Sequence, residues 1–329
     1  MSIKGKVALV CGLALAAVSL TVNPALADQA PLKVGYSDWP GWVAWDVAIN
    51  KGWLKEAGVN VQFQWFDYSA SLDAFAAGKI DGVFATNGDT LVTDGGGTKG
   101  VMIMLTDYSN GNDIIVGAPG IKSLKQLKGK KVGIEIGLVE HLLLLHGLKA
   151  TGMKESDITL VNSKTNDTPQ VLASGQVAAI GAWQPNAGQA MKLVPGSRPI
   201  YTSAKAPGLI YDVLTVNPAT LGPRKADWLK LIKVWDRVVH YIDDPKTQAD
   251  AIKIMAARDG LTPEAYKPLV KGTHLIDIAE GKKTFKKGPG LSSLYGSTAV
   301  SDDFNVKNAI YKTSMPFDSL IDPSFTNAQ

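Results

Sequence analysis

The chain has 329 residues, of which 45% are hydrophobic and 19% charged, with a formal net charge of +4. This balance excludes the strongly basic surface that is typical of nucleic-acid-binding proteins. The single cysteine, Cys11, lies in an expected export signal, which excludes thiol nucleophiles, cysteine-ligated zinc and disulfides from the rest of the chain.

Residues 1–27 are typical of a secretory signal. Two lysines precede an apolar run over 7–22, and small residues follow at the cleavage positions. We expect cleavage after Ala27, with Cys11 as an ordinary apolar residue of the signal. No later segment has the length and apolarity of a membrane span. The mature chain, of about 300 residues, exceeds what one hydrophobic core usually holds, which predicts two lobes.

Strand and helix patterns alternate along the mature chain. Helical patterns such as those at 69–77, 139–151 and 168–174 separate short strand patterns. This alternation predicts an α/β fold in which each lobe is a mainly parallel sheet flanked by helices. The expected strands are 32–36, 59–65, 82–86, 101–107, 114–118, 131–136, 158–161, 178–182 and 213–217.

The most informative segment is the junction after the first strand pattern, which ends at Tyr36. A helical pattern then restarts with Trp42, Trp45 and Trp53 on one stripe. Ligands of open α/β sheets bind at such strand-to-helix junctions. The junction presents Asp38, Trp39 and Trp42 without a Lys or Arg between 34 and 50. This chemistry favours a small, flat, positively charged ligand.

The same junction, with 51–58 (Lys-Gly-Trp-Leu-Lys-Glu-Ala-Gly) and 72–82 (Leu-Asp-Ala-Phe-Ala-Ala-Gly-Lys-Ile-Asp-Gly), resembles a known family. The chain is similar, from Pro31 to about Asn217, to ABC-transporter substrate-binding proteins for nitrate, taurine, aliphatic sulfonates and thiamine-pyrimidine precursors. Residues 36–42 (Tyr-Ser-Asp-Trp-Pro-Gly-Trp) resemble the branch associated with urea-carboxylase-type enzymes, for which guanidine is the implied ligand.

The resemblance implies a type II periplasmic binding protein with two lobes and a two-strand hinge. A short helix, a tight turn and a buried strand over 122–133 resemble the start of the second lobe in this family. We therefore expect one lobe at 28–115 and 216–329 and an inserted lobe at 116–215. A helical cap is expected on the first lobe, from helices over 224–241, 245–256 and 263–270. The expected protein is a periplasmic monomer without cofactor that serves a permease and its ATPase.

Four loops and the return hinge should converge on the crevice, because each loop follows the carboxyl end of a strand. Lys and Arg are absent from all four loops, whereas anions are usually held by these residues or by helix N-termini. A planar cation instead pairs with carboxylates and stacks on tryptophan. The candidate ligand-binding residues are Asp38, Trp39, Trp42, Asn87, Asp89, Glu135, Gly137, Glu140, Trp183 and Asp212.

Other interpretations remain open at this point. Asp38 and Asp89 equally fit helix caps, and Glu135 and Glu140 equally fit a solvated surface. Trp45 continues a buried stripe and is expected in the core. An aminopyrimidine, a urea-like molecule or a sulfonate is the alternative ligand. The family resemblance also reaches thiamine-pyrimidine synthases, but their cysteine-rich signature is absent, so we expect a protein without catalytic or metal-binding residues.

Overall fold

The computed structural model describes residues 29–329, and the expected signal lies outside these residues. Within them, β1 and its neighbours form a six-stranded sheet in the order β11-β4-β10-β3-β1-β2. β1 pairs in parallel with β2 and β3, whereas β10 runs antiparallel between β3 and β4. The strands are β1 (Leu32–Tyr36), β2 (Val61–Trp65), β3 (Gly82–Thr86), β4 (Val101–Ser109), β10 (Tyr211–Val216) and β11 (Thr273–Leu275).

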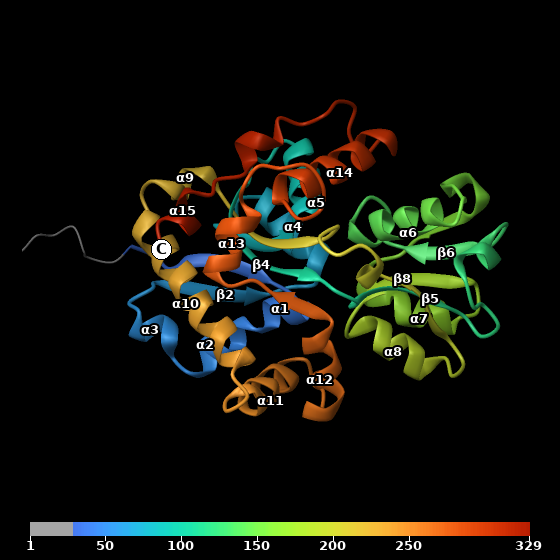
Figure 1. Ribbon diagram of the computed structural model, residues 1–329, viewed down its shortest axis with the longest axis horizontal. Helices are drawn as coiled ribbons and strands as arrows, with labels where there is room; N and C mark the ends of the chain where they lie inside the picture. Colours follow the sequence, from blue (N-terminus) through green and yellow to red (C-terminus); the bar gives the residue numbers. More distant parts are fainter. Residues whose placement is uncertain (1–28) are drawn as a thin grey trace, which may run out of the picture. The chain divides into compact units, whose positions relative to one another are not determined.

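A second sheet has five strands in the order β7-β6-β8-β5-β9. These strands are β5 (Asp113–Gly117), β6 (Lys131–Ile134), β7 (Thr159–Asn162), β8 (Ala179–Trp183) and β9 (Arg198–Thr202). The helices α6 (Val139–Ala150), α7 (Thr168–Ala173) and α8 (Asn186–Leu193) pack around this sheet, in green and yellow-green in Figure 1.

The expected two-sheet α/β fold is confirmed. Both sheets are mixed, and most strands of each share one direction, while β10 and β11 in the first sheet and β5 in the second run against it. β6 is parallel to β7 and β8, whereas β5 is antiparallel to β8 and β9. Parallel neighbours require a crossover connection, usually a helix. β5 and β10 instead enter their sheets directly from the other sheet, and each therefore runs antiparallel to its neighbours.

All strands of the second sheet lie between Asp113 and Thr202, and the strands of the first sheet lie on both sides of this range. The lobe boundaries at 115 and 215, and the hinge between the lobes, stay a prediction. β9 and β11 have no counterpart among the expected strands. β9 contains Pro199 and lies at the edge of its sheet, where a strand pattern is weak.

The expected helix through Trp42 and Trp53 is instead three short helices: α1 (Pro40–Val43), α2 (Trp45–Asn50) and α3 (Trp53–Glu56). Gly52 interrupts the stripe because its φ of 70° is left-handed, a conformation that glycine adopts without strain. Trp45 is fully buried, with its ring 5.1 Å from the ring of Trp235, so its expected place in the core is correct.

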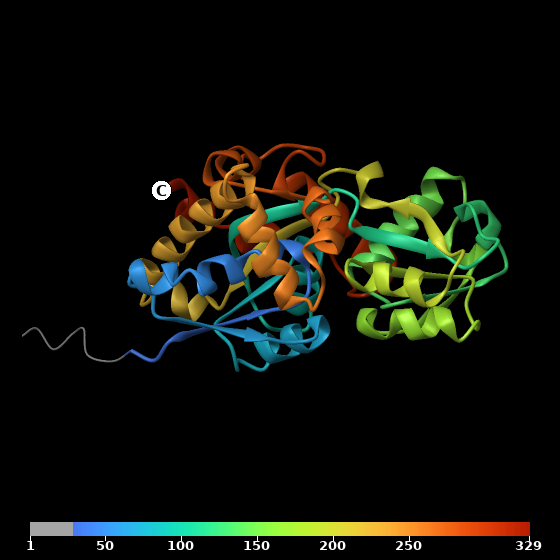
Figure 2. The same cartoon turned by 90° about the horizontal axis from the view of Figure 1, so that it is seen from below.

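The remaining helices lie mainly in the C-terminal third. α10 buries one stripe of apolar side chains, and both α10 and α11 pack against α2, as Figures 1 and 2 show. The bounds are α4 (Tyr68–Ala76), α5 (Asn87–Gly95), α9 (Pro218–Leu221), α10 (Lys225–Asp243), α11 (Gln248–Arg258), α12 (Pro263–Lys271), α13 (Ile278–Thr284), α14 (Leu294–Lys307) and α15 (Ser324–Asn327).

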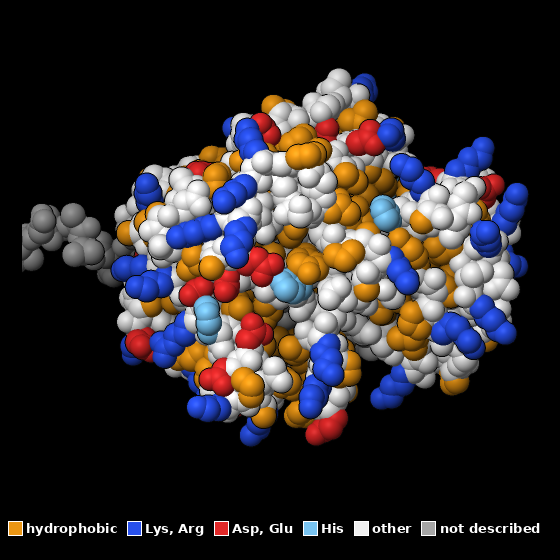
Figure 3. Space-filling view, viewed as in Figure 1, with side chains coloured by type: hydrophobic (Ala, Val, Ile, Leu, Met, Phe, Trp, Pro, Cys, Tyr) orange, Lys and Arg blue, Asp and Glu red, His pale blue; other side chains and the backbone are white. Residues whose placement is uncertain are grey.

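Two surface properties bear on partners. Over residues 29–329, no helix has the length and apolarity needed to cross a membrane. On the face drawn in Figure 3, the Lys and Arg side chains are dispersed among uncharged and acidic ones and do not form a continuous basic patch.

Candidate functional site

A small buried cavity lies where strands of both sheets end. It receives residues from the loop after β1, from α1 and α4, from β3 and β10 of the first sheet, and from β5, β8 and α6 of the second. About 10 Å³ is open to the centre of a water-sized molecule, which is room for about one water. The wall of the cavity contains Trp39, Trp42, Tyr68, Thr86, Asp113, Val139, Trp183, Ile210 and Asp212. Among these described residues there is no Lys or Arg.

Four aromatic rings form much of this wall. Trp42 lies 5.2 Å from Tyr68, with the ring planes tilted by 30°. Tyr68 in turn meets Trp183 edge to face at 5.3 Å. Four of the predicted ligand-binding residues, Trp39, Trp42, Trp183 and Asp212, thus come together around one cavity. Tyr68 was not predicted, because its position at the first turn of α4 resembles that of any helix start.

Asp107 and Asp212 form the first carboxyl pair, on neighbouring strands. They stand directly opposite one another in the register of β4 and β10. The indole nitrogen of Trp39 donates a 2.9 Å hydrogen bond to Asp107 Oδ1. A Cβ atom at Gly41 would lie 2.0 Å from Asp107 Oδ2, so only glycine leaves room for this carboxyl group. Asp107 was missed as a site residue, although the expected strand 101–107 ends on it.

Asp113 and Glu140 form the second pair, in the second sheet and its helix. Asp113 begins β5 and lies opposite Trp183 of β8 in the register. Glu140 is in the first turn of α6 and is fully buried, so its interpretation as a solvated side chain is wrong. A Cβ atom at Gly181 would lie 2.9 Å from Glu140 Cβ, so this glycine makes room for Glu140.

These four carboxyl groups are short of hydrogen-bond donors. In the described chain, no N–H or O–H group donates to Asp107 Oδ2, Asp113 Oδ2, Asp212 Oδ2 or either carboxyl oxygen of Glu140. Burying an ionised carboxylate without a donor or a cation is very unfavourable. Each of these carboxyl groups is therefore stable in this site only if it holds a proton or meets a donor or a cation.

The surroundings shift the pKa of each carboxyl group upward. Burial raises the pKa of Asp107 to about 6 and that of Asp113 to about 6. Burial, with the charges of Asp107 and Asp113, raises the pKa of Asp212 well above its ordinary value. Burial, with the charge of Asp113, does the same to Glu140. Strong upward shifts in a cavity are typical of functional sites.

Asp38, the first candidate of the sequence, joins the two sheets. Its Oδ1 accepts hydrogen bonds from Trp183 Nε1 at 2.9 Å and from Ser37 Oγ at 3.3 Å, and its Oδ2 accepts one from Asn186 Nδ2 at 2.8 Å. Burial raises its pKa, and these donors oppose the rise. Both of its oxygens are thus occupied by protein donors, and a direct contact of Asp38 with a ligand stays a prediction.

Asp89 and Asn87 lie at the start of α5, where the structure gives them protein partners. Asp89 Oδ2 accepts a 2.7 Å hydrogen bond from the hydroxyl group of Tyr68. Burial raises the pKa of Asp89 to about 7. Asn87 donates to Ser297 and Thr298 of α14 and accepts from the backbone nitrogen of Tyr211. Their predicted ligand contacts stay predictions.

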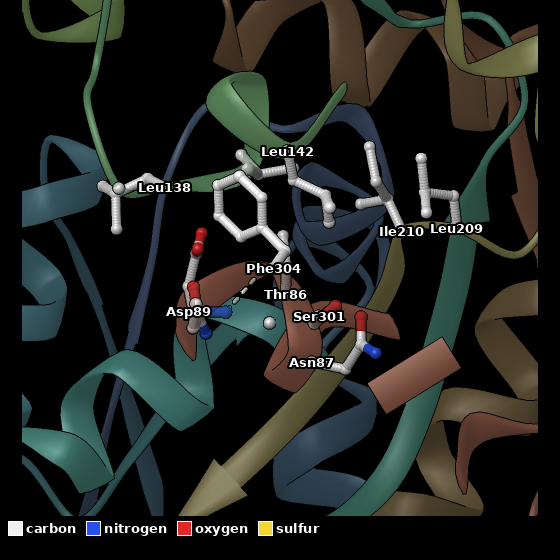
Figure 4. Close-up of a pocket in the computed structure, with 13 residues that line it drawn as sticks. Thr86, Asn87, Asp89, Leu138, Leu142, Leu209, Ile210, Ser301 and Phe304 are labelled. Carbon is white, nitrogen blue, oxygen red and sulfur yellow. Dashed lines mark hydrogen bonds between the residues drawn. The ribbon is translucent and has the colours of Figure 1, made fainter. Parts of the chain in front are cut away.

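A second small cavity lies beside these residues. In Figure 4, the apolar side chains of Leu138, Leu142 and Phe304 face the polar groups of Asp89 and Ser301 across this space. Gly137, a predicted site residue, also lines it, with a left-handed φ of 91°.

Glu135, the last of the predicted acidic residues, lies in the loop after β6 and contacts Thr165. Its Oε2 accepts hydrogen bonds from the backbone nitrogen and the hydroxyl group of Thr165, at 3.1 and 3.3 Å. It is 9% exposed and does not line the aromatic cavity. Its predicted ligand contact is untested. No group of three or more His, Cys, Asp or Glu residues within 29–329 is arranged to hold a metal ion.

Two mixed sheets flanked by helices, with a buried polar site where their strands end, define the fold of the periplasmic binding proteins. The family model described as NMT1/THI5-like matches residues 40–221, more than half of the chain, and the chain belongs to this family. A Brucella abortus (strain 2308) protein, named as a candidate binding protein, is 31% identical over 183 residues, which are 54% of this chain and 56% of that protein. The chain therefore spans about half the length of this curated relative.

Solved structures share the fold over almost the whole chain. The alkanesulfonate-binding protein SsuA from Xanthomonas axonopodis pv. citri, bound to MOPS, has a TM-score of 0.75 at 17% identity, covering 90% of this chain and 99% of that one. The desulfurization enzyme DszB has a TM-score of 0.63 at 16% identity, covering 91% and 98%. At such identities the likeness shows the fold alone, and the same fold serves a binding protein and an enzyme.

Proposed function

We propose that this protein is the periplasmic receptor of an ABC importer, that it binds a small planar cation such as guanidine between its two lobes, and that it delivers this cation to the permease. The receptor works as a monomer without a cofactor, and the permease draws on a cytoplasmic ATPase. The protein acts as a receptor and not as an enzyme, so the ligand is released chemically unchanged. Exchange of the ligand requires the lobes to open and close at the predicted hinge.

The observation that carries the proposal is the composition of the aromatic cavity. Trp39, Trp42, Tyr68 and Trp183 present ring faces and edges, while Asp113 and Asp212 bring carboxyl oxygens that lack a donor. Aromatic cages attract cations through the negative potential of the ring faces. Guanidinium is flat, stacks on such rings and pairs with a carboxylate through two parallel hydrogen bonds.

An anion fits this site poorly. Sulfonates and nitrate require cationic side chains or free N–H groups. None of the described residues lining the aromatic cavity is a Lys or Arg, and the carboxyl groups of Asp113 and Asp212 would repel an anion. The alkanesulfonate-binding protein SsuA therefore shares the fold of this chain, whereas the site residues of this chain favour a ligand of the opposite charge.

The size of the cavity separates the cation from the aminopyrimidine alternative. The cavity has room for about one water molecule, so even guanidinium needs a slight opening of the site. A substituted pyrimidine ring needs a considerably larger displacement of Trp42 and Trp183. A urea-like molecule is similar in size to guanidinium but lacks the charge that would compensate the buried carboxylates.

Calorimetric titration of the mature chain tests the proposal. Guanidinium chloride is compared with urea, taurine, nitrate, choline and an aminopyrimidine, each at low millimolar concentrations, well below those at which guanidinium denatures proteins. We expect saturable binding of guanidinium alone or by far most tightly. Tight binding of taurine or nitrate without binding of guanidinium would remove the cation from the proposal and leave a receptor for an anion.

The same preparation tests the expected export. Sequencing of the N-terminus of the protein recovered from the periplasm should begin at Asp28. A mature chain that begins elsewhere would correct the cleavage position, and a protein retained in the cytoplasm would contradict the receptor.

A further inference from the structure

We infer that the site exchanges protons for its cation: binding of a guanidinium-type ligand expels at least one proton from the carboxyl groups of Asp107, Asp113, Glu140 and Asp212. The inference rests on the proposed function and adds a linkage between ligand binding and pH. Its basis is the geometry of two carboxyl pairs, fully shielded from solvent, with five oxygens that no described donor reaches.

In the ligand-free site, these four groups cannot all be ionised. Mutual repulsion and the loss of hydration oppose each additional charge, as in other pairs of carboxyl groups that share one proton. Asp107 and Asp212 stand opposite one another on β4 and β10, and the charge of Asp113 acts on both. Within each pair, a retained proton supplies the missing hydrogen-bond donor.

The charged and titratable groups that surround the pairs do not remove this need. Asp89 of α5 and Glu135, in the loop after β6, act on Glu140 and raise its pKa further. Tyr68 of α4 donates to Asp89 and remains neutral, because burial raises its pKa well above the ordinary value. His141, next to Glu140 on α6, instead faces Glu155, with its Nε2 at 3.3 Å from Glu155 Oε2.

The chemistry of the ligand makes release of a proton necessary. Guanidinium has only N–H donors and no acceptor. The paired contact needs both oxygens of a carboxyl group to accept, and a protonated carboxyl group offers only its carbonyl oxygen as a good acceptor. The proton therefore has to leave before the two parallel hydrogen bonds can form. The positive charge of the ligand then stabilises the carboxylate that remains. Urea has a carbonyl oxygen that accepts from a protonated carboxyl group, so any binding of urea should proceed without this release.

Calorimetry of guanidinium binding at about pH 7, in phosphate and in Tris, measures the released protons directly. The two buffers differ in the enthalpy of taking up a proton, so release appears as a difference between the observed enthalpies. Burial and neighbouring charges raise the pKa of Asp212 and of Glu140 well above their ordinary values, so these groups hold protons at pH 7. We expect a difference that corresponds to about one proton or more, and a dissociation constant that rises about tenfold for each proton released when the pH is lowered by one unit from pH 7.

The possible outcomes separate the inference from the proposed function. Binding with equal enthalpies in both buffers, and with an affinity independent of pH, would overturn the inference alone. An absence of guanidinium binding in both buffers would overturn the proposed function and the inference with it.

Two isosteric variants assign the protons to residues. Glu140→Gln and Asp113→Asn each remove one titratable carboxyl group with little change of volume, and each should lower the number of released protons by up to one. The matched controls are Glu56→Gln and Asp318→Asn, on exposed residues paired with Arg237 and Lys287. Both controls should release as many protons as the wild type. Unchanged release in both test variants would contradict the assignment.

Discussion

Trp183 Nε1 donates a 2.9 Å hydrogen bond to Asp38 Oδ1, and so connects the end of β8 in the second sheet to the loop after β1 in the first. The two residues are 145 positions apart in the chain. Both are buried, and the indole of Trp183 also lines the aromatic cavity. The contact therefore connects the two sheets through a residue that also forms part of the wall of the cavity.

The first prediction concerns this connection. Trp183→Phe keeps an aromatic ring but removes the donor to Asp38, and a buried acceptor that loses its donor costs about 1–3 kcal/mol. We expect at least tenfold weaker guanidinium binding and a lower melting temperature, by calorimetry and thermal unfolding. Trp65→Phe, at a position 39% exposed and outside the wall of the cavity, is the matched control and should leave the affinity unchanged. Unaltered affinity in Trp183→Phe would separate the connection from binding.

The charge of Asp38 is a second, separate test. In Asp38→Asn, the new amide group would present a donor to Trp183 or Asn186, each of which already donates. We expect binding weaker by more than about 1.4 kcal/mol, a tenfold change in the dissociation constant. If affinity in a folded Asp38→Asn variant matches the wild type, Asp38 has no part in the site.

The third prediction concerns the aromatic wall. Trp42 is 2% exposed and packs at 5.2 Å against Tyr68. Trp42→Ala should weaken guanidinium binding by more than about 1.4 kcal/mol, because it removes a cation–π contact. Since this change also opens a cavity, Trp42→Phe is made alongside and should retain an intermediate affinity. Equal affinity of all three proteins would place the ligand elsewhere.

Gly41 provides a fourth test, through the position of Asp107. Gly41→Ala would place a methyl group 2.0 Å from Asp107 Oδ2, so the carboxyl group or α1 must shift. We expect a loss of stability of about 1–3 kcal/mol and weaker binding. Gly222→Ala is the matched control, because its added Cβ meets nothing within 4 Å and its φ is −75°. If the two variants behave alike, Asp107 does not require this space.

The fifth prediction is the pH dependence of stability. Burial raises the pKa of Asp89 to about 7 and those of Asp107 and Asp113 to about 6, from 3.8. The folded state therefore holds protons that the unfolded state releases, and the stabilisation present below about pH 4 is lost as the pH rises through 6 to 7. The melting temperature of the ligand-free protein should fall between about pH 5 and pH 8. A rise over this range would contradict buried, protonated carboxyl groups.

Local sequence signals were sufficient for part of the site. A strand that ends before an acidic and aromatic loop identified Trp39 and Trp42, and the end of a small-residue strand identified Trp183; all three line the cavity. Asp107 and Asp113 were missed because they lie within or at the start of strands. Asp107 faces Asp212, and Asp113 faces Trp183, because strands that are far apart in the sequence pair in each sheet. The sequence pattern does not specify this pairing.

The fold, like the site, was predicted where local sequence signals were sufficient and missed where they were not. The first strand and the third were predicted at their observed bounds, because each is a buried apolar run with clear turn residues on either side. The direction of β5 and β10 was not predicted, since it follows from how the chain crosses between the two sheets and not from the residues of the strands themselves.

The most direct test of the central claim is a calorimetric titration of the mature wild-type chain with guanidinium chloride, set against taurine and nitrate under the same conditions. A carboxyl-rich and indole-lined cavity predicts saturable binding of guanidinium and no measurable binding of either anion. Saturable binding of taurine or nitrate, with no heat from guanidinium, would contradict a cation site.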